Sequence, residues 1–303
     1  MKVTIFGASG DQGQAQMRQL IAAGHEVRAA VRHPERCARQ WSAVAADYRA
    51  PDSLRRAMEG TEAVFLTLPS TSFQKAQDVH AAATHVANAA RDAGVNILIF
   101  NSSMIICDAP NGFAAHDARF AIRQNLFESG VPTVSIQPVI YLDNLLREWA
   151  YPDIVHDAMI RYPHEEVLDV CWISQDDTAK LMIAAAARPD LAGRGFNVGG
   201  REPVRGPILA QRLSQAVGRS IGFETLAIAN FAERMARIFR SSTTLDTVAL
   251  TSALERIYHW YNHSPERPFW VDMVPVLAEM PVELETIEQW ADRQDWSPLC
   301  SCR

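Results

Sequence analysis

The chain has 303 residues, of which 48% are hydrophobic and 21% are charged, and this is enough for a large core with a smaller second domain. Its net charge of −6 argues against nucleic acid as the main partner. The sequence has no long apolar run and no signal-peptide pattern, so neither a membrane span nor export is expected. Five scattered cysteines do not suggest a disulfide framework, and we expect a cytoplasmic protein.

Strands and helices alternate through the first half of the chain. A buried strand is predicted at residues 3–6 and an amphipathic helix at 13–23, which Gly24 ends. Further strands are predicted at 27–31, 63–68, 95–100 and 133–136, and further helices at 53–58, 74–93 and 119–128. This alternation is typical of a parallel sheet covered by helices on both faces. The predicted fold class is therefore α/β, a Rossmann-type doubly wound parallel sheet.

The alternation ends beyond about residue 145, where proline and aromatic residues interrupt the pattern. A helix is predicted at 178–187, a short strand and turn at 196–200, and further helices at 207–217, 230–240, 244–262 and 283–293. We divide the chain into a Rossmann domain at 1–150 and a smaller, mostly helical region at 151–303. This second region is expected to be partly interleaved with the first and to bind a substrate.

A glycine-rich loop joins the first predicted strand to the first predicted helix. Gly7 permits the tight turn, Gly10 lets the backbone approach a pyrophosphate, and Gly13 allows the helix to pack closely on the strand. Backbone N–H groups at the start of that helix then face the phosphates. The loop, residues 7–13, predicts a dinucleotide site that also includes Ser9, Asp11 and Gln12.

The end of the second predicted strand indicates which dinucleotide is bound. Sites that select NAD usually place a carboxylate about 20 residues beyond the loop. This chain has Arg32 there, followed by Arg36. An arginine in this place can bind a ribose 2′-phosphate, so we predict an NADP(H) site with Arg32 as the main contact and Arg36 as a weaker one.

The sequence resembles the NmrA-like family of atypical short-chain dehydrogenases/reductases. The resemblance covers most of residues 1–220 and rests on the glycine loop, Arg32, Asp47, and the segments 101–103, 128–133, 137–144 and 177–179. It implies that the loop and Arg32 bind NADP(H) and that Asp47 lies near the adenine. It further implies that the rest of the cofactor groove is lined by Leu68, Pro69, Asn101, Ser102 and Pro138.

The catalytic residues typical of short-chain reductases are not all present. The Tyr-x-x-x-Lys pair of such enzymes corresponds to Ala115 and Arg119 here, so the usual proton donor is missing. Arg119 keeps a positive charge that can bind the ribose or a substrate oxygen, but it cannot readily donate a proton. His116 and Tyr141 are the two candidate replacements, and a helix cap or a pocket wall are their alternative roles. Ser102 and Ser103 either orient a carbonyl or only satisfy the end of the strand.

These features predict an NADPH-dependent oxidoreductase that delivers hydride to a small apolar or aromatic organic molecule, such as a quinone, enone, imine or carbonyl compound. The alternative is a non-catalytic NADP(H)-binding redox sensor that regulates a protein partner, which the resemblance also allows. Neither a metal site nor a nucleic-acid or membrane partner is expected. A homodimer or a regulatory protein partner is compatible with both functions.

Overall fold

The computed structural model describes residues 1–37 and 41–296. By its internal contacts the chain divides into two compact units that interleave along the sequence. Unit 1 comprises residues 1–138, 175–198 and 274–282, and unit 2 comprises residues 139–174, 199–273 and the described residues from 283. Each unit is therefore built from segments that lie far apart in the sequence.

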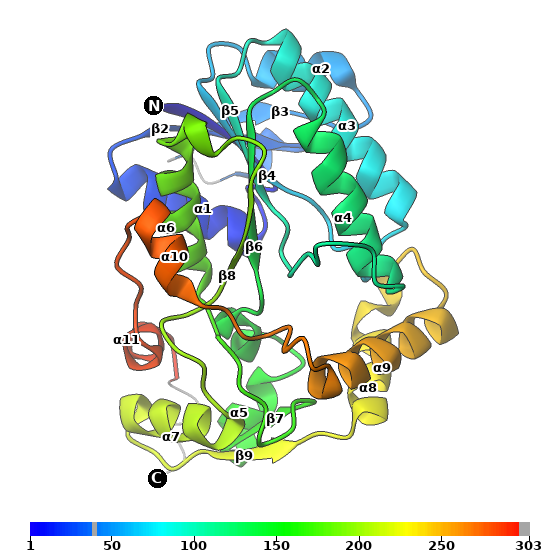
Figure 1. Cartoon of the computed structure of the whole chain (residues 1–303), viewed down its shortest axis with the longest axis vertical. Coiled ribbons are helices and arrows are strands. Elements are labelled where there is room, and N and C mark those ends of the chain that lie inside the picture. The colour runs from blue at the N-terminus through cyan, green and yellow to red at the C-terminus, as the bar shows by residue number, and fades with distance from the viewer. Residues whose placement is uncertain (38–40, 297–303) are drawn as a thin grey trace. The chain divides into compact units, whose positions relative to one another are not determined.

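Unit 1 is built on a seven-stranded parallel sheet with the strand order β3-β2-β1-β4-β5-β6-β8 (Figure 1). The strands are β1 (Lys2–Phe6), β2 (Glu26–Val31), β3 (Ser42–Ala45), β4 (Ala63–Thr67), β5 (Ile97–Asn101), β6 (Thr133–Pro138) and β8 (Gly195–Val198). The strand order reverses at β1, which pairs with both β2 and β4. Open α/β sheets bind ligands beyond the carboxyl ends of strands at such a reversal. The predicted Rossmann-type fold class is confirmed.

Helices cover both faces of this sheet, which explains why β4 and β5 are almost wholly buried. Figure 1 shows α1 (Asp11–Ala22) and α6 (Gln175–Ala186) on one side, and α3 (Ala76–Asp92) and α4 (Ala114–Phe127) on the other. Helix α3 contacts both α4 and α2 (Pro51–Ala57). Its buried face is rich in alanine, and such small side chains allow a helix to approach the sheet closely.

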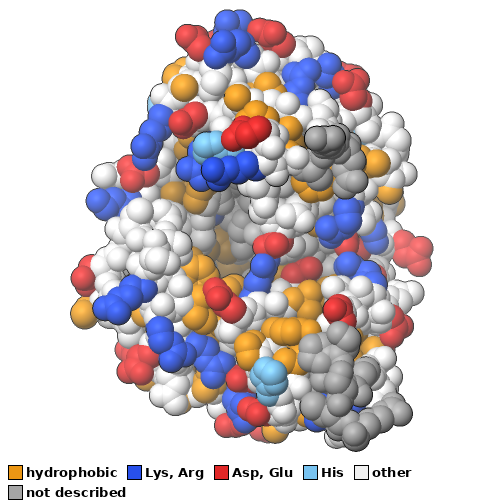
Figure 2. Space-filling model, turned by 180° about the vertical axis from the view of Figure 1, so that it is seen from behind, with side chains coloured by type: hydrophobic (Ala, Val, Ile, Leu, Met, Phe, Trp, Pro, Cys, Tyr) orange, Lys and Arg blue, Asp and Glu red, His pale blue; other side chains and the backbone are white. Residues whose placement is uncertain are grey.

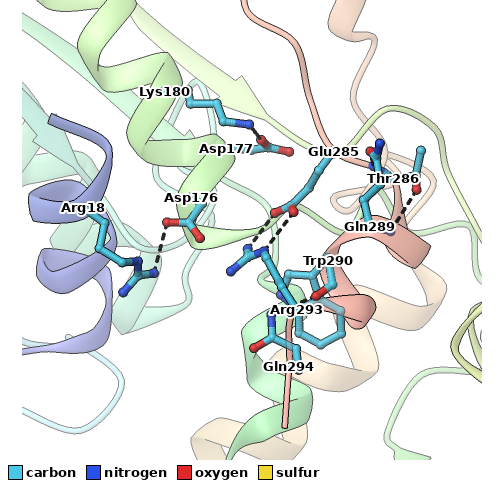
Figure 3. A network of polar contacts seen from close by, with 10 residues as sticks. All are labelled: Arg18, Asp176, Asp177, Lys180, Glu285, Thr286, Gln289, Trp290, Arg293 and Gln294. Carbon is cyan, nitrogen blue, oxygen red and sulfur yellow. Dashed lines mark hydrogen bonds and ion pairs between the residues drawn. The ribbon is translucent and has the colours of Figure 1, made fainter. Parts of the chain in front are cut away.

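Two adjacent carboxylates in the first turn of α6 have cationic partners (Figure 3). Arg18 on α1 donates to Oδ1 of Asp176 over 3.0 Å, and Nζ of Lys180 lies 2.7 Å from Oδ1 of Asp177. The Asp177 side chain is only 2% exposed. The paired cations and the helix N-terminus both stabilise these buried negative charges, and the Arg18 pair joins α6 to α1.

Unit 2 combines several helices with a small parallel sheet. Its two strands are β7 (Met159–Tyr162) and β9 (Gly222–Thr225). Its core includes a cluster of aromatic rings around His164, whose ring centroid lies 4.7 Å from that of Tyr162 and 4.9 Å from that of Phe269. Its helices are α5 (Tyr151–Asp157), α7 (Gly206–Val217), α8 (Ile228–Ile238), α9 (Thr247–His263) and α11 (Ile287–Asp292).

The element boundaries differ from the sequence prediction in several places. Helix α4 begins at Ala114, five residues before the predicted start. The strands β3, β7 and β9 and the helices α5 and α10 (Met273–Glu279) have no predicted counterpart. The predicted strand and turn at 196–200 overlaps β8, which completes the sheet of unit 1.

The surface carries charges of both signs. Figure 2 shows basic and acidic side chains interspersed over one face of the molecule, with hydrophobic side chains in smaller groups between them. Among the described helices, none combines the length and the apolar character that crossing a lipid bilayer would require.

Candidate functional site

The glycine loop connects β1 to α1 beside the strand reversal, and its three glycines are in different environments. Gly7 has φ +84°, and a Cβ built on it would lie 2.6 Å from the carbonyl oxygen of Thr67. A Cβ on Gly13 would lie 2.2 Å from the carbonyl oxygen of Gly7. A Cβ on Gly10 would meet only that same oxygen, at 3.4 Å. Packing within the chain therefore explains Gly7 and Gly13, whereas Gly10 faces open space.

Helix α1 begins directly after this open position. Gly10 is its N-cap and provides no side chain to cap the helix, and Ser9, Gly10 and Asp11 are exposed. The start of a twelve-residue helix carries partial positive charge from its backbone N–H groups. The loop and the start of α1 thus form a surface suited to an anionic group such as a pyrophosphate.

Gln12 links this helix start to the carboxyl end of β5. Its Oε1 accepts hydrogen bonds from Nδ2 of Asn101 at 3.0 Å and from Oγ of Ser103 at 2.9 Å. The backbone N–H of Ser103 donates to Oδ1 of Asn101 at 2.9 Å, and Ser103 has φ +62°. A non-glycine residue in the left-handed region is uncommon and costs about 1 kcal/mol or more. The hydrogen bonds of Ser103 with Gln12 and Asn101 hold the Ser103 backbone in that conformation.

A second glutamine fixes α1 to β4 one helical turn later. Nε2 of Gln16 donates to Oγ1 of Thr67 at 2.9 Å. Gln16 is only 1% exposed, and its Oε1 has no hydrogen-bond partner among the described residues. The loop is therefore held against the carboxyl ends of β4 and β5, the next two strands after β1 in the sheet order.

The carboxyl end of β2 carries exposed basic residues. Arg32 and Arg36 are both exposed, and within the described part of the chain no carboxylate lies within ion-pair distance of Arg32. Burial raises the pKa of Tyr48 well above its ordinary value, and the Arg32 cation opposes that shift. Arg32 is therefore an exposed cation at the carboxyl end of β2.

The remaining residues predicted to line the groove lie at the same edge of unit 1. Asp47 is exposed, and its Oδ1 accepts a hydrogen bond from the backbone of Arg49 at 2.9 Å. Leu68 is buried and Pro69 is exposed, directly beyond β4. Asn101 is 1% exposed at the end of β5, and Pro138 ends β6.

Arg119 is wholly buried on α4, at 0% exposure. Its Nη2 donates to the carbonyl oxygen of Pro69 at 2.7 Å and lies 3.4 Å from that of Leu68. Thr71 makes a parallel connection by donating to the carbonyl of Ala115 at 2.9 Å. In this structure Arg119 holds the segment after β4 against α4 and does not present its cation at the surface.

His116 is also buried, at 2% exposure, and its ring contacts Phe113 edge-on. Burial lowers the pKa of His116 to about 4, although the neighbouring Asp117 carboxylate raises it slightly. The imidazole is therefore neutral near pH 7, and a neutral imidazole is a poor proton donor. The N-cap of α4 is Phe113, so His116 does not cap this helix.

The two serines after β5 differ in accessibility. Ser102 is 0% exposed, and its Oγ lies 2.5 Å from the carbonyl oxygen of Met104, to which it donates. Ser103 is half-buried and turns its hydroxyl toward Gln12. Ser103 is thus the serine near the glycine loop. Its left-handed backbone turns its side chain away from that of Ser102, and no residue pattern in the sequence predicts this conformation.

Tyr141 belongs to unit 2. It is 4% exposed, pairs with Ile173 as an isolated parallel bridge, and is the N-cap of the 3₁₀ segment η2 (Leu142–Leu146). The structure therefore gathers the loop, Arg32, Asp47 and the residues beyond β4 and β5 within unit 1, while this candidate proton donor lies in the other unit.

The sheet order, the open Gly10 and the helix start define a Rossmann-type nucleotide-binding fold. Residues 1–266 match the model of the NmrA-like family. The chain belongs to this family.

Individual relatives differ in what they do. An NAD(P)H azoreductase from Xenophilus azovorans is 25% identical over 244 residues, covering 77% of this chain and 80% of that protein. The NADPH-dependent quinone oxidoreductase of Escherichia coli, solved with NADPH, has a TM-score of 0.72 and 17% identity, with 96% and 98% of the two chains covered. NmrA, a negative transcriptional regulator solved with NAD, has a TM-score of 0.72 and 16% identity over 98% of each chain. Both structural similarities show the fold.

Proposed function

We propose that this chain is an NADPH-dependent oxidoreductase that transfers hydride to a small apolar or aromatic organic molecule. The observation that carries the proposal is the combination of an open glycine loop at the strand reversal with Arg32 at the end of β2. The loop suits a pyrophosphate, and a cation with no carboxylate partner among the described residues suits a 2′-phosphate. NADP(H) contains both groups.

The residues of unit 1 fit this cofactor in the order in which its parts would lie along the carboxyl edge. Arg32 binds the 2′-phosphate, Asp47 lies toward the adenine, and Gly10 with the first turn of α1 holds the pyrophosphate. Arg36 adds a weaker phosphate contact. The reactive end is lined from β4, β5 and β6 by Leu68, Pro69, Asn101, Ser103 and Pro138. Ser9, Asp11, Gln12 and Gly13 complete the loop.

When bound, NADPH supplies a hydride to the substrate, which also takes up a proton, and NADP⁺ is released. The protein positions the reacting groups and excludes water. The Ser103 hydroxyl is the polar group best placed to contact a substrate, because Gln12 and Asn101 fix its position. Its proton is donated to Oε1 of Gln12, so it accepts a hydrogen bond from the substrate, or donates one by exchanging Gln12 for a substrate oxygen or nitrogen. Ser102 and Arg119 act as positioning residues beneath the surface.

The proton is proposed to come from Tyr141, from water or from an acidic group of the substrate. His116 is neutral near pH 7, so its role is to pack under the start of α4. The azoreductase and quinone oxidoreductase among the relatives support a conjugated acceptor, since azo compounds and quinones both accept hydride with little need for a strong protein acid.

The cofactor assignment is tested by replacing Arg32. Arg32→Ala should weaken NADPH binding by roughly 10- to 100-fold, because a charge-assisted phosphate contact is lost, and should leave NADH binding nearly unchanged. Titration of cofactor fluorescence measures both dissociation constants. Arg91→Ala, which removes another half-exposed arginine of unit 1, is the control. An equal loss for NADPH and NADH would show that Arg32 does not bind the phosphate.

The activity is tested with NADPH oxidation across quinones, azo dyes, enones, imines and aldehydes, with product quantified against cofactor consumed. We expect turnover of at least one conjugated acceptor. Ser103→Ala should lower kcat while leaving the NADPH dissociation constant within about threefold. Unchanged turnover in this variant would remove Ser103 from the reactive site.

A non-catalytic redox sensor is the second candidate function. Ala115 at the usual tyrosine position and the neutral, buried His116 favour it, and NmrA itself is a transcriptional regulator. Tight NADP(H) binding, no turnover across the panel and a protein partner whose affinity changes between NADPH and NADP⁺ would establish the sensor instead.

A further inference from the structure

The carboxyl end of β2 carries one carboxylate among its cations. Glu35 lies in the 3₁₀ turn η1 (Pro34–Arg36). Its Oε1 lies 3.1 Å from Nδ1 of His33 and 4.0 Å from Nε of Arg36. All three side chains are more than half exposed. A single carboxylate therefore already engages two of the three basic residues at the described positions 32–37.

Arg32 differs from these two residues. No carboxylate of the described residues pairs with it. An incoming phosphate would find Arg32 available but would compete with Glu35 for His33 and Arg36. Because the carboxylate and the phosphate are both anions, the charge of Glu35 opposes phosphate binding across this short segment, and salt screens the effect.

The two cofactors differ at one position that such a carboxylate distinguishes. NADPH carries a 2′-phosphate, which a carboxylate repels. NADH carries a 2′-hydroxyl instead, and this hydroxyl can donate a hydrogen bond to a carboxylate. Glu35 thus favours NADH relative to NADPH, while Arg32 favours NADPH. The two residues act in opposite directions on the same choice.

We propose that Glu35 is a specificity-determining residue that restrains the preference for NADPH by holding His33 and Arg36 away from the 2′-phosphate. This inference rests on the proposed NADP(H) site. It assigns Arg32 the main phosphate contact in the native protein, where Glu35 keeps the Arg36 contact weak, and expects the Arg36 contact to strengthen when Glu35 is neutralised.

The test compares Glu35→Gln with Glu26→Gln. Glu26 is similarly exposed and is also paired with a cation, Lys2 at 3.3 Å, but it lies at the opposite, amino end of the same strand. Both variants change the net charge by one. Dissociation constants for NADPH and NADH are measured at low salt by fluorescence titration. Glu35→Gln should tighten NADPH binding about five- to tenfold and raise the NADPH-to-NADH preference by at least that factor, whereas Glu26→Gln should leave the preference unchanged.

A double-mutant cycle separates the role of Arg36. Arg36→Ala should change NADPH binding less than about twofold in the native background but about fivefold or more beside Glu35→Gln. Equal preference ratios for Glu35→Gln and Glu26→Gln would overturn the inference while leaving the proposed function intact. Failure of the unmodified protein to bind NADPH at millimolar concentration would overturn both.

Discussion

The glycines of the loop differ in what a methyl group at each would contact. At Gly10 the backbone has φ −83° and ψ 165°, which any residue adopts, and the nearest atom to an added Cβ is at 3.4 Å. At Gly13 the added Cβ would collide with the backbone of the loop. Gly10 therefore leaves room for a ligand, whereas Gly13 is required by the fold itself.

This difference predicts two distinct phenotypes. Gly10→Ala should leave Tm of the cofactor-free protein within about 2 °C of the native value but weaken NADPH binding at least about tenfold, because the methyl group would occupy the path to the pyrophosphate. Gly13→Ala should lower the free energy of unfolding by about 1–3 kcal/mol through overpacking. Thermal melts and cofactor titration of both variants make the comparison. Native-like NADPH affinity in Gly10→Ala would rule out a pyrophosphate at this position.

The residue patterns on which the candidate site was predicted are local in sequence. The glycine spacing and the arginine after the second strand required no knowledge of distant contacts. The burial of Ser102 and Arg119 could not be predicted, because their side chains donate to carbonyl groups of Ile136 and Pro69 that only the folded chain brings near. The pairing of Glu35 with its neighbours is local in sequence, but it depends on the 3₁₀ turn.

At the scale of elements, α4 and the segment after β4 are held together by side chains that donate to backbone carbonyls. Arg119 supplies the central contact. If it is a positioning residue, Arg119→Met should lower the free energy of unfolding of the cofactor-free protein by about 2–4 kcal/mol, since buried carbonyls lose a charged donor. Urea unfolding without cofactor measures this.

Thr71→Val provides the matched control, because it removes one neutral hydrogen bond between the same elements and should cost only about 1 kcal/mol. A cofactor-free Arg119→Met protein as stable as the native one, with impaired NADPH binding, would instead indicate that Arg119 acts directly on the ligand.

The elements that the sequence did not predict are short. Strands β3, β7 and β9 have four residues each, too few for a hydrophobic period to be recognised. β7 and β9 also pair across about 60 residues of intervening chain. The apolar runs that form the buried strands β4 and β5, and the long amphipathic helix α3, were predicted because their pattern alone specifies them.

At the scale of the whole molecule, both units contain a buried histidine that resists protonation. Burial lowers the pKa of His116 in unit 1 to about 4 and that of His164 in unit 2 to about 3. His164 is surrounded by aromatic rings, and its Nε2 has no hydrogen-bond partner among the described residues. Both histidines are neutral at neutral pH, where burying them costs little stability.

Acid should therefore destabilise the protein through these residues. Below pH 6.5 the unfolded chain binds protons that the folded chain does not, so stability is lost as the pH falls from about 6.5 toward 4 for His116 and toward 3 for His164. The slope for each histidine approaches about 1.4 kcal/mol per pH unit once the pH is well below 6.5. The variant His164→Leu removes the contribution of His164 to this pH dependence of stability.

Urea unfolding at several pH values between about 7 and 5 tests this. The stability of His164→Leu should fall less steeply than that of the native protein by up to about that slope. Parallel curves for the native protein and His164→Leu would contradict a neutral, buried His164.

The interleaving of the two units has a consequence for how the protein is made. β8 and α6, which complete the sheet of unit 1 and cover one of its faces, follow β6 only after residues 139–174 have been added. On the ribosome, the nascent chain must therefore carry an unpaired edge on β6 and an uncovered apolar face on α1 while part of unit 2 emerges. Such surfaces are targets for chaperones and sites of aggregation. A fragment ending near residue 150 would retain both exposed surfaces permanently, so the cofactor-binding half of this protein is not separable by a single cut.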